Sequence, residues 1–318
     1  MSNKLVGFKT VFDNTINNEL QDNLIEFFDW GLLEKGNYFN TSLGETSPQG
    51  LDYSLLKPSK SEHYSEGQAW EGFRKNWIWQ SGISPPSGFI PPFVGSNNAI
   101  PGISGVYVDD TFYPSDTAGA YSHYVDYFNG TVIFNTPIAT GSKVQAEHSY
   151  KYINVVYANA VPWLREVQTN TLQNKPLNPI PTEMKIQLPA IAVEVVPART
   201  MKGLQLGGGQ WVYTDVLFHC IAENDITRNS LVDIVSYQND RSIKTFDTAS
   251  ISLSNAFSLD YRGVPNSGAL SYPQMVSNYP GSTIFLKSVR SSDSYVINSN
   301  IYLGTVRFTV ESVSKILS

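Results

Sequence analysis

The stretch LPAIAVEVVPARTMKGLQLGGGQWVYTDVLFHCIAENDITRNSLVDIV, residues 188–235, decides the fold. It contains two apolar runs, 188–196 and 211–221, separated by a loop with three successive glycines, Gly207, Gly208 and Gly209. Both runs are rich in β-branched and aromatic residues, which is typical of strands. The stretch therefore predicts two strands joined across a glycine loop.

The second run is followed by a predicted helix over 225–238 and by a further strand near 243–247. Asn224 or Asp225 can cap the helix, and Leu231, Ile234 and Val235 form its sheet-facing stripe. We expect that stripe to pack against strand residues, namely Ile191, Val193 and Leu217. The opposite face of the helix, with Arg228 and the nearby Arg241, is either a solvated surface or a contact with another subunit.

Outside this stretch the clearest helix covers residues 14–34, where apolar side chains recur every three or four residues. The C-terminal part predicts strands at 282–286, 294–297 and 305–311. Residues 248–282, rich in Ser, Asn, Gly and Pro, predict an extended excursion without regular structure.

Residues 36–102 show little periodicity and are interrupted by Pro, Gly and Ser, which predicts a long irregular arm. Within this arm Trp70, Phe73, Trp77 and Trp79 lie inside ten residues. Such an aromatic load is either a packed plug or an exposed anchor for a neighbouring protein.

Residues 103–160 predict a small inserted β unit resembling a sandwich. Asn129-Gly130 lies between apolar residues and predicts a hairpin with a type I′ turn. Alternation along 143–152 predicts a strand with one solvated face. Residues 161–186 contain four prolines and predict a linker.

Composition bounds the function further. Charged residues make up 16% of the 318 residues, below the ~25% usual for globular domains, while aromatics reach 13%. Such a surface favours burial against other protein, although a β-rich protein is also rich in aromatics. The net charge of −6, without a basic cluster, does not indicate a direct grip on nucleic acid.

No residue pattern selects an active site. The glycine loop lacks a following Lys-Ser or Lys-Thr and leads into a strand, so it does not fit a phosphate loop. The four histidines lack ligand spacing, and no acidic run matches a calcium loop. The single cysteine, Cys220, lies within a predicted strand and fits a buried small hydrophobe. We therefore expect no catalytic, metal or cofactor site, and we do not expect the protein to be an enzyme.

The order helix, strand, glycine loop, strand, helix, strand resembles the core of tail-terminator proteins from the neck of tailed bacteriophages. The resemblance covers the helix at 14–34, residues 187–247 and the last strand near 301–313, and it includes the phrase VLFHCIAEN at 216–224. It implies an α+β fold, in which two helices pack on a small mixed sheet, and a hexameric ring. This chain is about twice as long as is usual in that family, through an insertion at roughly 36–186.

The expected organisation is a ring module from 1–35 and 187–318, an arm from 36–102, the β unit from 103–160 and a linker from 161–186. The resemblance implies a virion protein assembled in the host bacterial cytoplasm. Its partners would be further copies of itself and other neck, tail-tube or connector proteins, with DNA only passing through the lumen and no membrane. Candidate interface residues are Trp70, Phe73, Trp77, Trp79, Gly207, Gly208, Gly209, Arg228 and Arg241. The alternatives are a β-rich virion protein that binds a receptor or glycan, and a glycan-cleaving enzyme.

Overall fold

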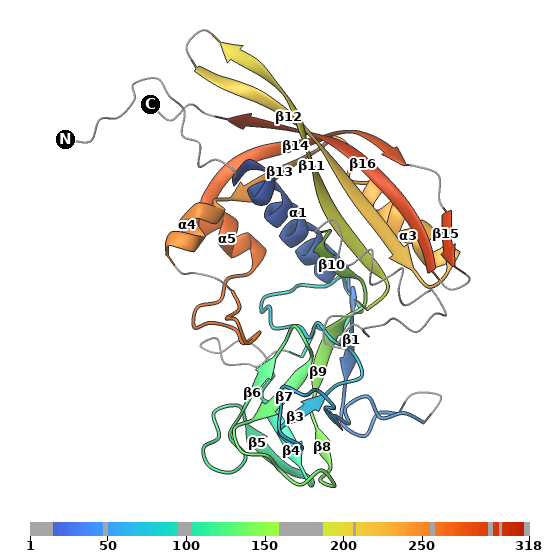
Figure 1. The fold of residues 1–318 in the computed structure, drawn as a ribbon, viewed down its shortest axis with the longest axis vertical. Coiled ribbons are helices and arrows are strands. Elements are labelled where there is room, and N and C mark those ends of the chain that lie inside the picture. The colour runs from blue at the N-terminus through green and yellow to red at the C-terminus, as the bar shows by residue number, and fades with distance from the viewer. Residues whose placement is uncertain are drawn as a thin grey trace, which may run out of the picture.

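The computed structural model describes residues 15–46, 50–93, 103–158, 187–205, 208–254, 258–291, 295–298 and 301–314. The fold is α+β, as the sequence predicted, with far more strand than helix among the described residues. It has two parts, a large curved sheet carrying the helices and a smaller β unit beneath it (Figure 1). The predicted linker at 161–186 lies outside the described residues.

The large sheet is built from long strands. Its order is β10 (Asn154–Tyr157), β11 (Ala190–Gln205), β12 (Gly208–Ala222), β16 (Ile301–Ser314), β14 (Pro280–Ser291) and β13 (Arg241–Phe246), and β15 (Tyr295–Asn298) pairs with β16. β10 runs parallel to β11, whereas the other pairs are antiparallel, so the sheet is mixed. The two predicted strands around the glycine loop are β11 and β12.

Four described helices accompany this sheet: α1 (Thr15–Glu34), α3 (Asp225–Ser236), α4 (Thr248–Leu253) and α5 (Tyr272–Asn278). α1 ends where Gly36 adopts φ +85°, a conformation that glycine tolerates best. Asn224 caps α3, because its side chain accepts a hydrogen bond from the Thr227 amide at 2.8 Å. The excursion expected at 248–282 instead contains α4 and α5. Asp247 caps α4 and Ser271 begins α5, and these local caps compensate for the weak periodicity.

The main core lies between one face of the sheet and the helices α1 and α3. Even-numbered residues of β12, among them Val216, Phe218 and Cys220, are buried there. Leu20, Leu24 and Phe28 of α1 and Leu231 and Val235 of α3 pack against them. Figure 1 shows α1 lying under the curved sheet. Both predicted helices therefore pack on the same face.

One expected core residue faces the other way. Leu217 follows Val216 on β12, and successive strand residues point to opposite faces, so Leu217 is only half-buried. That opposite face is largely polar: Asp215 pairs with Arg307, Glu311 pairs with Lys287, and His219 contacts Glu194 at 2.8 Å. Leu217 does not belong to the helix-facing core.

The β unit consists of short strands in three small sheets. The four-stranded sheet has the order β2 (Lys57–Pro58), β3 (Ala69–Glu71), β7 (Thr131–Phe134) and β6 (His123–Asp126). The three-stranded sheet is β5 (Thr111–Pro114), β4 (Gly105–Val108) and β8 (Val144–Gln145), and the two-stranded one is β1 (Tyr38–Thr41) with β9 (His148–Lys151). Side chains from all three sheets share one core.

The predicted irregular arm at 36–102 is therefore not a separate segment. β1, β2 and β3 all come from it and pair with each other or with strands of the later β unit. Conversely, β10 at the end of the predicted unit joins the large sheet. Sequence periodicity missed the three early strands because each has only two to four residues.

The hairpin around Asn129-Gly130 exists, but its turn differs from the prediction. β6 and β7 enclose a four-residue connection, 127–130, because Asp126 pairs with Thr131. Gly130 has φ +63°, whereas Asn129 is not among the residues with positive φ that a type I′ turn requires. Asp126 instead accepts hydrogen bonds from the backbone and side chain of Asn129 at 3.0 and 2.7 Å.

The two-residue turn with positive φ at both positions is Asp109-Asp110, at +48° and +64°, between β4 and β5. The predicted strand at 143–152 is split between β8 and β9, which belong to different sheets. It is buried on both faces, since Gln145 and Ser149 are 5% and 0% exposed. The polar residues of that strand therefore do not mark a solvated face.

The chain leaves the large-sheet module for the β unit and returns from it at one point. The Asn37 side chain donates to the Ile153 carbonyl at 3.0 Å and accepts from its amide at 2.9 Å. This pair of bonds closes the excursion 38–152 at its base. The structure thus defines the insertion by residues 38–152.

The contact between the two parts combines an apolar cluster, in which Trp30 and Leu33 of α1 pack against Ile78 and Ile83, with polar contacts. Asp29 of α1 accepts hydrogen bonds from Lys151 at 2.7 Å and from Gln80 at 3.2 Å. The pKa of the neighbouring Glu26 is raised from its ordinary 4.5 to about 7, mainly by burial and also by the charge of Asp29, while Lys151 opposes the shift. The insertion is therefore fixed to α1 next to a carboxyl group that is uncharged in mild acid.

The Leu231→Ala variant tests the core. Leu231 is 1% exposed, so truncation leaves a cavity, and we expect a loss of unfolding free energy of about 2–5 kcal/mol. Leu217→Ala is the matched control on the opposite face, with an expected loss of about 1 kcal/mol or less. Urea unfolding followed by circular dichroism measures both. Equal losses would contradict the assignment of faces.

The Glu26→Gln variant tests the buried carboxyl group. A folded-state pKa of about 7 means that ionisation between pH 4.5 and about 7 destabilises the folded chain. We expect the natural protein to lose roughly 1–3 kcal/mol relative to the variant across this window, a range that allows for the partial exposure of Glu26.

The measurement is the difference in unfolding free energy between the two proteins at several pH values. Burial also lowers the pKa of His148 to about 4, which destabilises the fold towards acid. That contribution is present in both proteins and cancels. A pH-independent difference would refute the assigned pKa of Glu26.

Candidate assembly interface

The tryptophans proposed as interface anchors are core residues. Trp70, Trp77 and Trp79 are 1%, 1% and 7% exposed and lie in the core of the β unit. The Trp77 ring stacks on His148 with centroids 4.0 Å apart, and its indole donates to the Arg74 carbonyl at 2.8 Å. These residues form the packed plug, and their burial excludes them as docking anchors in this fold.

Phe73, from the same cluster, is 51% exposed. Its ring stacks on Tyr53 with centroids 4.6 Å apart, and the Arg74 guanidinium lies 5.7 Å from its centroid. An exposed aromatic pair beside a cation is a small binding surface of its own. The sequence could not separate Phe73 from the buried tryptophans.

The glycine loop forms the tip of a long hairpin between β11 and β12. Gly207 lies outside the described residues, while Gly208 begins β12 and pairs with Gln205. Gly209 has φ +67°, which a residue with a side chain rarely adopts. The loop thus turns the chain tightly at the tip.

We name residues 199–205 and 208–214 the arm; the segment 36–102, for which the sequence predicted an irregular arm, is not part of it. Figure 1 shows this pair of strands projecting beyond the body of the sheet. β10 covers the outer edge of β11 only at 190–193, and a register shift separates Val195 from Arg199. Among the described residues no strand pairs with the outer edge of 199–205, so its backbone groups are open.

The arm exposes apolar side chains along that open edge. Met201 is 46% and Leu204 is 40% exposed, and the Lys202 ammonium lies 5.4 Å from the Tyr213 ring centroid. An open, partly apolar edge is a template for pairing with another chain. One feature of the sequence indicates this projecting hairpin: the segment 197–206 is too long for a turn, and it lacks the apolar pattern of a core strand.

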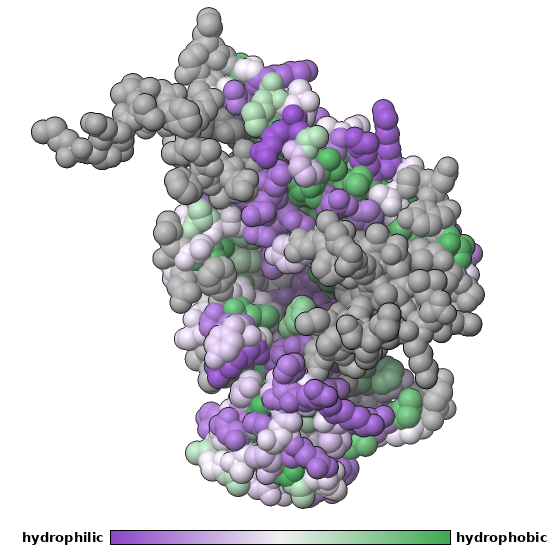
Figure 2. Space-filling model, in the orientation of Figure 1, coloured by the Kyte–Doolittle hydropathy of each residue, from purple (hydrophilic) through white to green (hydrophobic). Residues whose placement is uncertain are grey.

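On the face seen in Figure 2, the coloured hydrophobic residues are interspersed with hydrophilic ones.

Arg228 does not lie on the outer face of α3. It is 9% exposed, its guanidinium lies 5.9 Å from the Tyr302 ring centroid, and its Nε donates to Asn229 at 2.9 Å. Its position at the N-terminal end of α3, over the end of β16, draws the long side chain across the sheet. Arg228 is therefore a packing residue rather than a candidate contact.

Arg241 is exposed, as expected, at the start of β13. It lines a groove together with residues of α1, α3 and α5, and its guanidinium lies 5.5 Å from the Phe27 ring centroid. One of its Nη atoms donates to Gln238 at 2.5 Å. Of the two arginines selected from the sequence, only Arg241 is accessible to a partner.

The cysteine of the chain, Cys220, is buried in the core. Burial raises the pKa of the Cys220 thiol to about 12, so it stays protonated at neutral pH. Within the described part of the chain, no group of three or more His, Cys, Asp or Glu residues is placed to hold a metal ion. None of the described helices is both long and apolar enough to cross a membrane.

Comparison with protein-family models, with curated proteins and with solved structures finds no match to this chain.

Proposed function

We propose that this chain is a structural subunit of a tailed-phage virion, forming a ring of six copies at the neck or tail-terminator position. The observation that carries the proposal is the arm, an open edge with exposed Met201 and Leu204. The proposal is also supported by the order of elements: an N-terminal helix, two strands joined by a glycine loop, a second helix on the same face and a C-terminal strand.

An arm of this kind is incomplete alone. Its β12 strand pairs with β16 from Gln210 onward, but its outer edge has no strand partner among the described residues, and its exposed apolar residues gain stability when a neighbour covers them. If a different surface of the next copy receives the arm, the contact is head-to-tail, and a rotation that closes makes a ring. A stable contact of this kind buries at least about 1,000 Å².

The two parts of the chain then have separate roles. The large-sheet module makes the ring, and the insertion 38–152 contacts the next layer of the virion, which is another neck, tail-tube or connector protein. The net charge of −6 suits a lumen through which DNA passes without adhering.

A second function is favoured by one specific observation. The exposed Phe73, stacked on Tyr53 beside Arg74, resembles the aromatic platforms on which sugar rings bind. The protein would then be a receptor- or glycan-binding component of the virion. Binding of the isolated protein to a glycan array, abolished by Phe73→Ala, would favour this alternative over the ring.

The double variant Met201→Glu, Leu204→Glu tests the arm. We expect the natural chain to form a ring in native mass spectrometry and sedimentation, and the variant to be a folded monomer, because charged side chains oppose burial of the edge. Ile226→Glu is the control, since Ile226 is 75% exposed on α3 and away from the arm. A natural protein that stays monomeric, or a double variant that still forms rings, would count against the proposal.

Replacing residues 38–152 by a short glycine-serine linker tests the division of roles. The ends of the replaced segment meet at Asn37 and Ile153, so a short linker spans them. We expect the shortened chain to fold with lower stability, because Trp30 and Leu33 lose their packing against Ile78 and Ile83.

We also expect the shortened chain to form rings that no longer bind isolated phage tails, as seen in electron micrographs of the mixtures. A shortened chain that stays folded but loses the ring would show that the insertion is itself a ring-forming element.

A further inference from the structure

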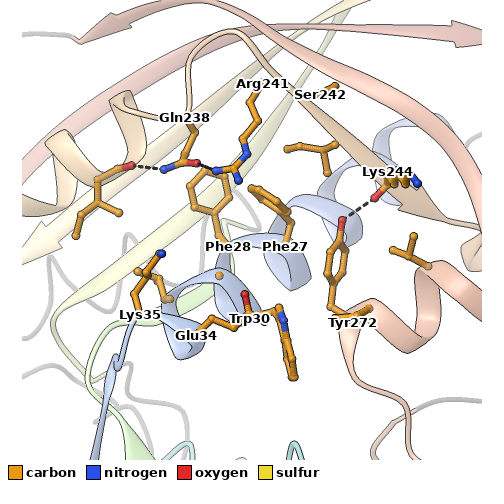
Figure 3. Close-up of a pocket in the computed structure, with 16 residues that line it drawn as sticks. Phe27, Phe28, Trp30, Glu34, Lys35, Gln238, Arg241, Ser242, Lys244 and Tyr272 are labelled. Carbon is orange, nitrogen blue, oxygen red and sulfur yellow. Dashed lines mark hydrogen bonds between the residues drawn. The ribbon is translucent and has the colours of Figure 1, made fainter. Parts of the chain in front are cut away.

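A groove crosses the concave side of the large-sheet module between the end of α1, the end of α3, β13 and α5. It has a volume of about 560 Å³, in the range of ligand-binding clefts. Phe27, Trp30, Ile243 and Tyr272 supply apolar and aromatic lining. Figure 3 shows Arg241 and Gln238 on one wall and Lys35, Glu34 and Trp30 on the other.

One wall of the groove is a strand edge. β13 is the last strand of the sheet, so its outer backbone groups have no strand partner among the described residues. Two positions on this edge are capped by side chains: the Lys244 carbonyl accepts from the Tyr272 hydroxyl at 2.6 Å, and Asn23 bonds both backbone groups of Phe246. These caps protect part of the edge, as edge strands commonly require.

Ser242 is left open. Backbone groups alternate sides along a strand, so those of Ser242 point outward as the Lys244 carbonyl does, two residues later. Ser242 is exposed and its outward groups have no hydrogen-bond partner among the described residues. The edge therefore offers the donor and the acceptor of Ser242, together with the outward amide of Lys244, to an extended chain laid along the groove.

The charges around the groove are unbalanced. Lys35, Arg241 and Lys244 contribute three positive charges, against the single carboxylate of Glu34. None of these three cations forms an ion pair with a carboxylate of the described chain. Arg241 uses one hydrogen bond on Gln238, which leaves most of its donors for a carboxylate.

We propose that this groove is a docking site for an extended, acidic segment of a partner protein, with apolar side chains at alternate positions. The apolar side chains would face Phe27 and Tyr272, the carboxylates would meet Arg241 and Lys35, and the backbone would pair with Ser242. This site is independent of the ring contact made by the arm. The arm of a second copy does not fit, because it carries Arg199 and Lys202 and no acidic residue among its described positions.

A labelled peptide of alternating aspartate and leucine is the probe, and the same peptide with lysine in place of aspartate is its control. Fluorescence anisotropy with the full chain should show saturable binding of the aspartate peptide that weakens as salt rises. Arg241→Glu should weaken binding at least about tenfold. Ser242→Pro should weaken it as well, because an edge strand tolerates proline but loses the outward donor.

Arg290→Glu, at an exposed cation of β14 that does not line the groove, should leave binding unchanged. Lys35→Glu, on the opposite wall, gives the same test if Arg241→Glu fails to fold by circular dichroism. The proposal is overturned if saturable binding is absent, if the lysine peptide binds as well, or if the wall variants bind normally. It is also overturned if the aspartate peptide dissociates the oligomer, since a second copy would then occupy the groove.

Discussion

Burial of one face of β12 against α1 and α3 holds the large sheet in place. β12 pairs with β11 on one side and with β16 on the other along nearly all of its length. Its alternate side chains, such as Val216 and Phe218, are fully buried by the two helices. Because a shift of one residue would turn this whole set outward, the register of the neighbouring strands follows from that of β12. The same register places residues of the opposite face next to each other, so that ion pairs such as Asp215 with Arg307 form between neighbouring strands.

The insertion depends on this module without interrupting it. The hydrogen bonds between Asn37 and Ile153 hold the start and the end of the insertion together, so the large sheet continues without a gap. The insertion has its own core around Trp70 and Trp77, and the link from Asp29 to Lys151 fixes its orientation on α1. A part with a core of its own can carry a surface that is separate from that of the rest of the chain.

The proposed roles use features that the compact fold leaves unsatisfied. The arm extends past β10 with an open edge, and the groove along β13 keeps Ser242 open between side-chain caps. In a protein that functions as a monomer, we would expect other parts of the chain to cover both surfaces. Both surfaces are basic, so they differ in shape rather than in sign of charge: the arm is an open strand edge, whereas the groove is concave and lined by aromatic residues. The proposed assembly into a larger particle would account for both.

The sequence by itself determined the elements with strong periodicity or caps. The helix at 14–34, the strands around the glycine loop, the helix beginning near Asn224 and the last strand follow from local pattern, and the structure has them all. It also predicted the burial of Leu231 and Val235 on the second helix, although it placed the buried Arg228 on the outside and counted the half-buried Ile234 in the same stripe. Local chemistry suffices there because the contacts of a helix stripe repeat along the sequence.

The tertiary structure alone decided which residues of the candidate interface are accessible. The tryptophan cluster lies in the core and Phe73 does not, although they occupy one short stretch, because β3 and β7 pair across about 60 residues. The strand near Gln145 is buried on both faces because the segment with Asp52 and Ser54, far away in the sequence, covers the side that alternation left to solvent. Arg228 is buried because β16, far away in the sequence, brings Tyr302 beneath it. Long-range pairing brings such residues together, and no local pattern in the sequence records it.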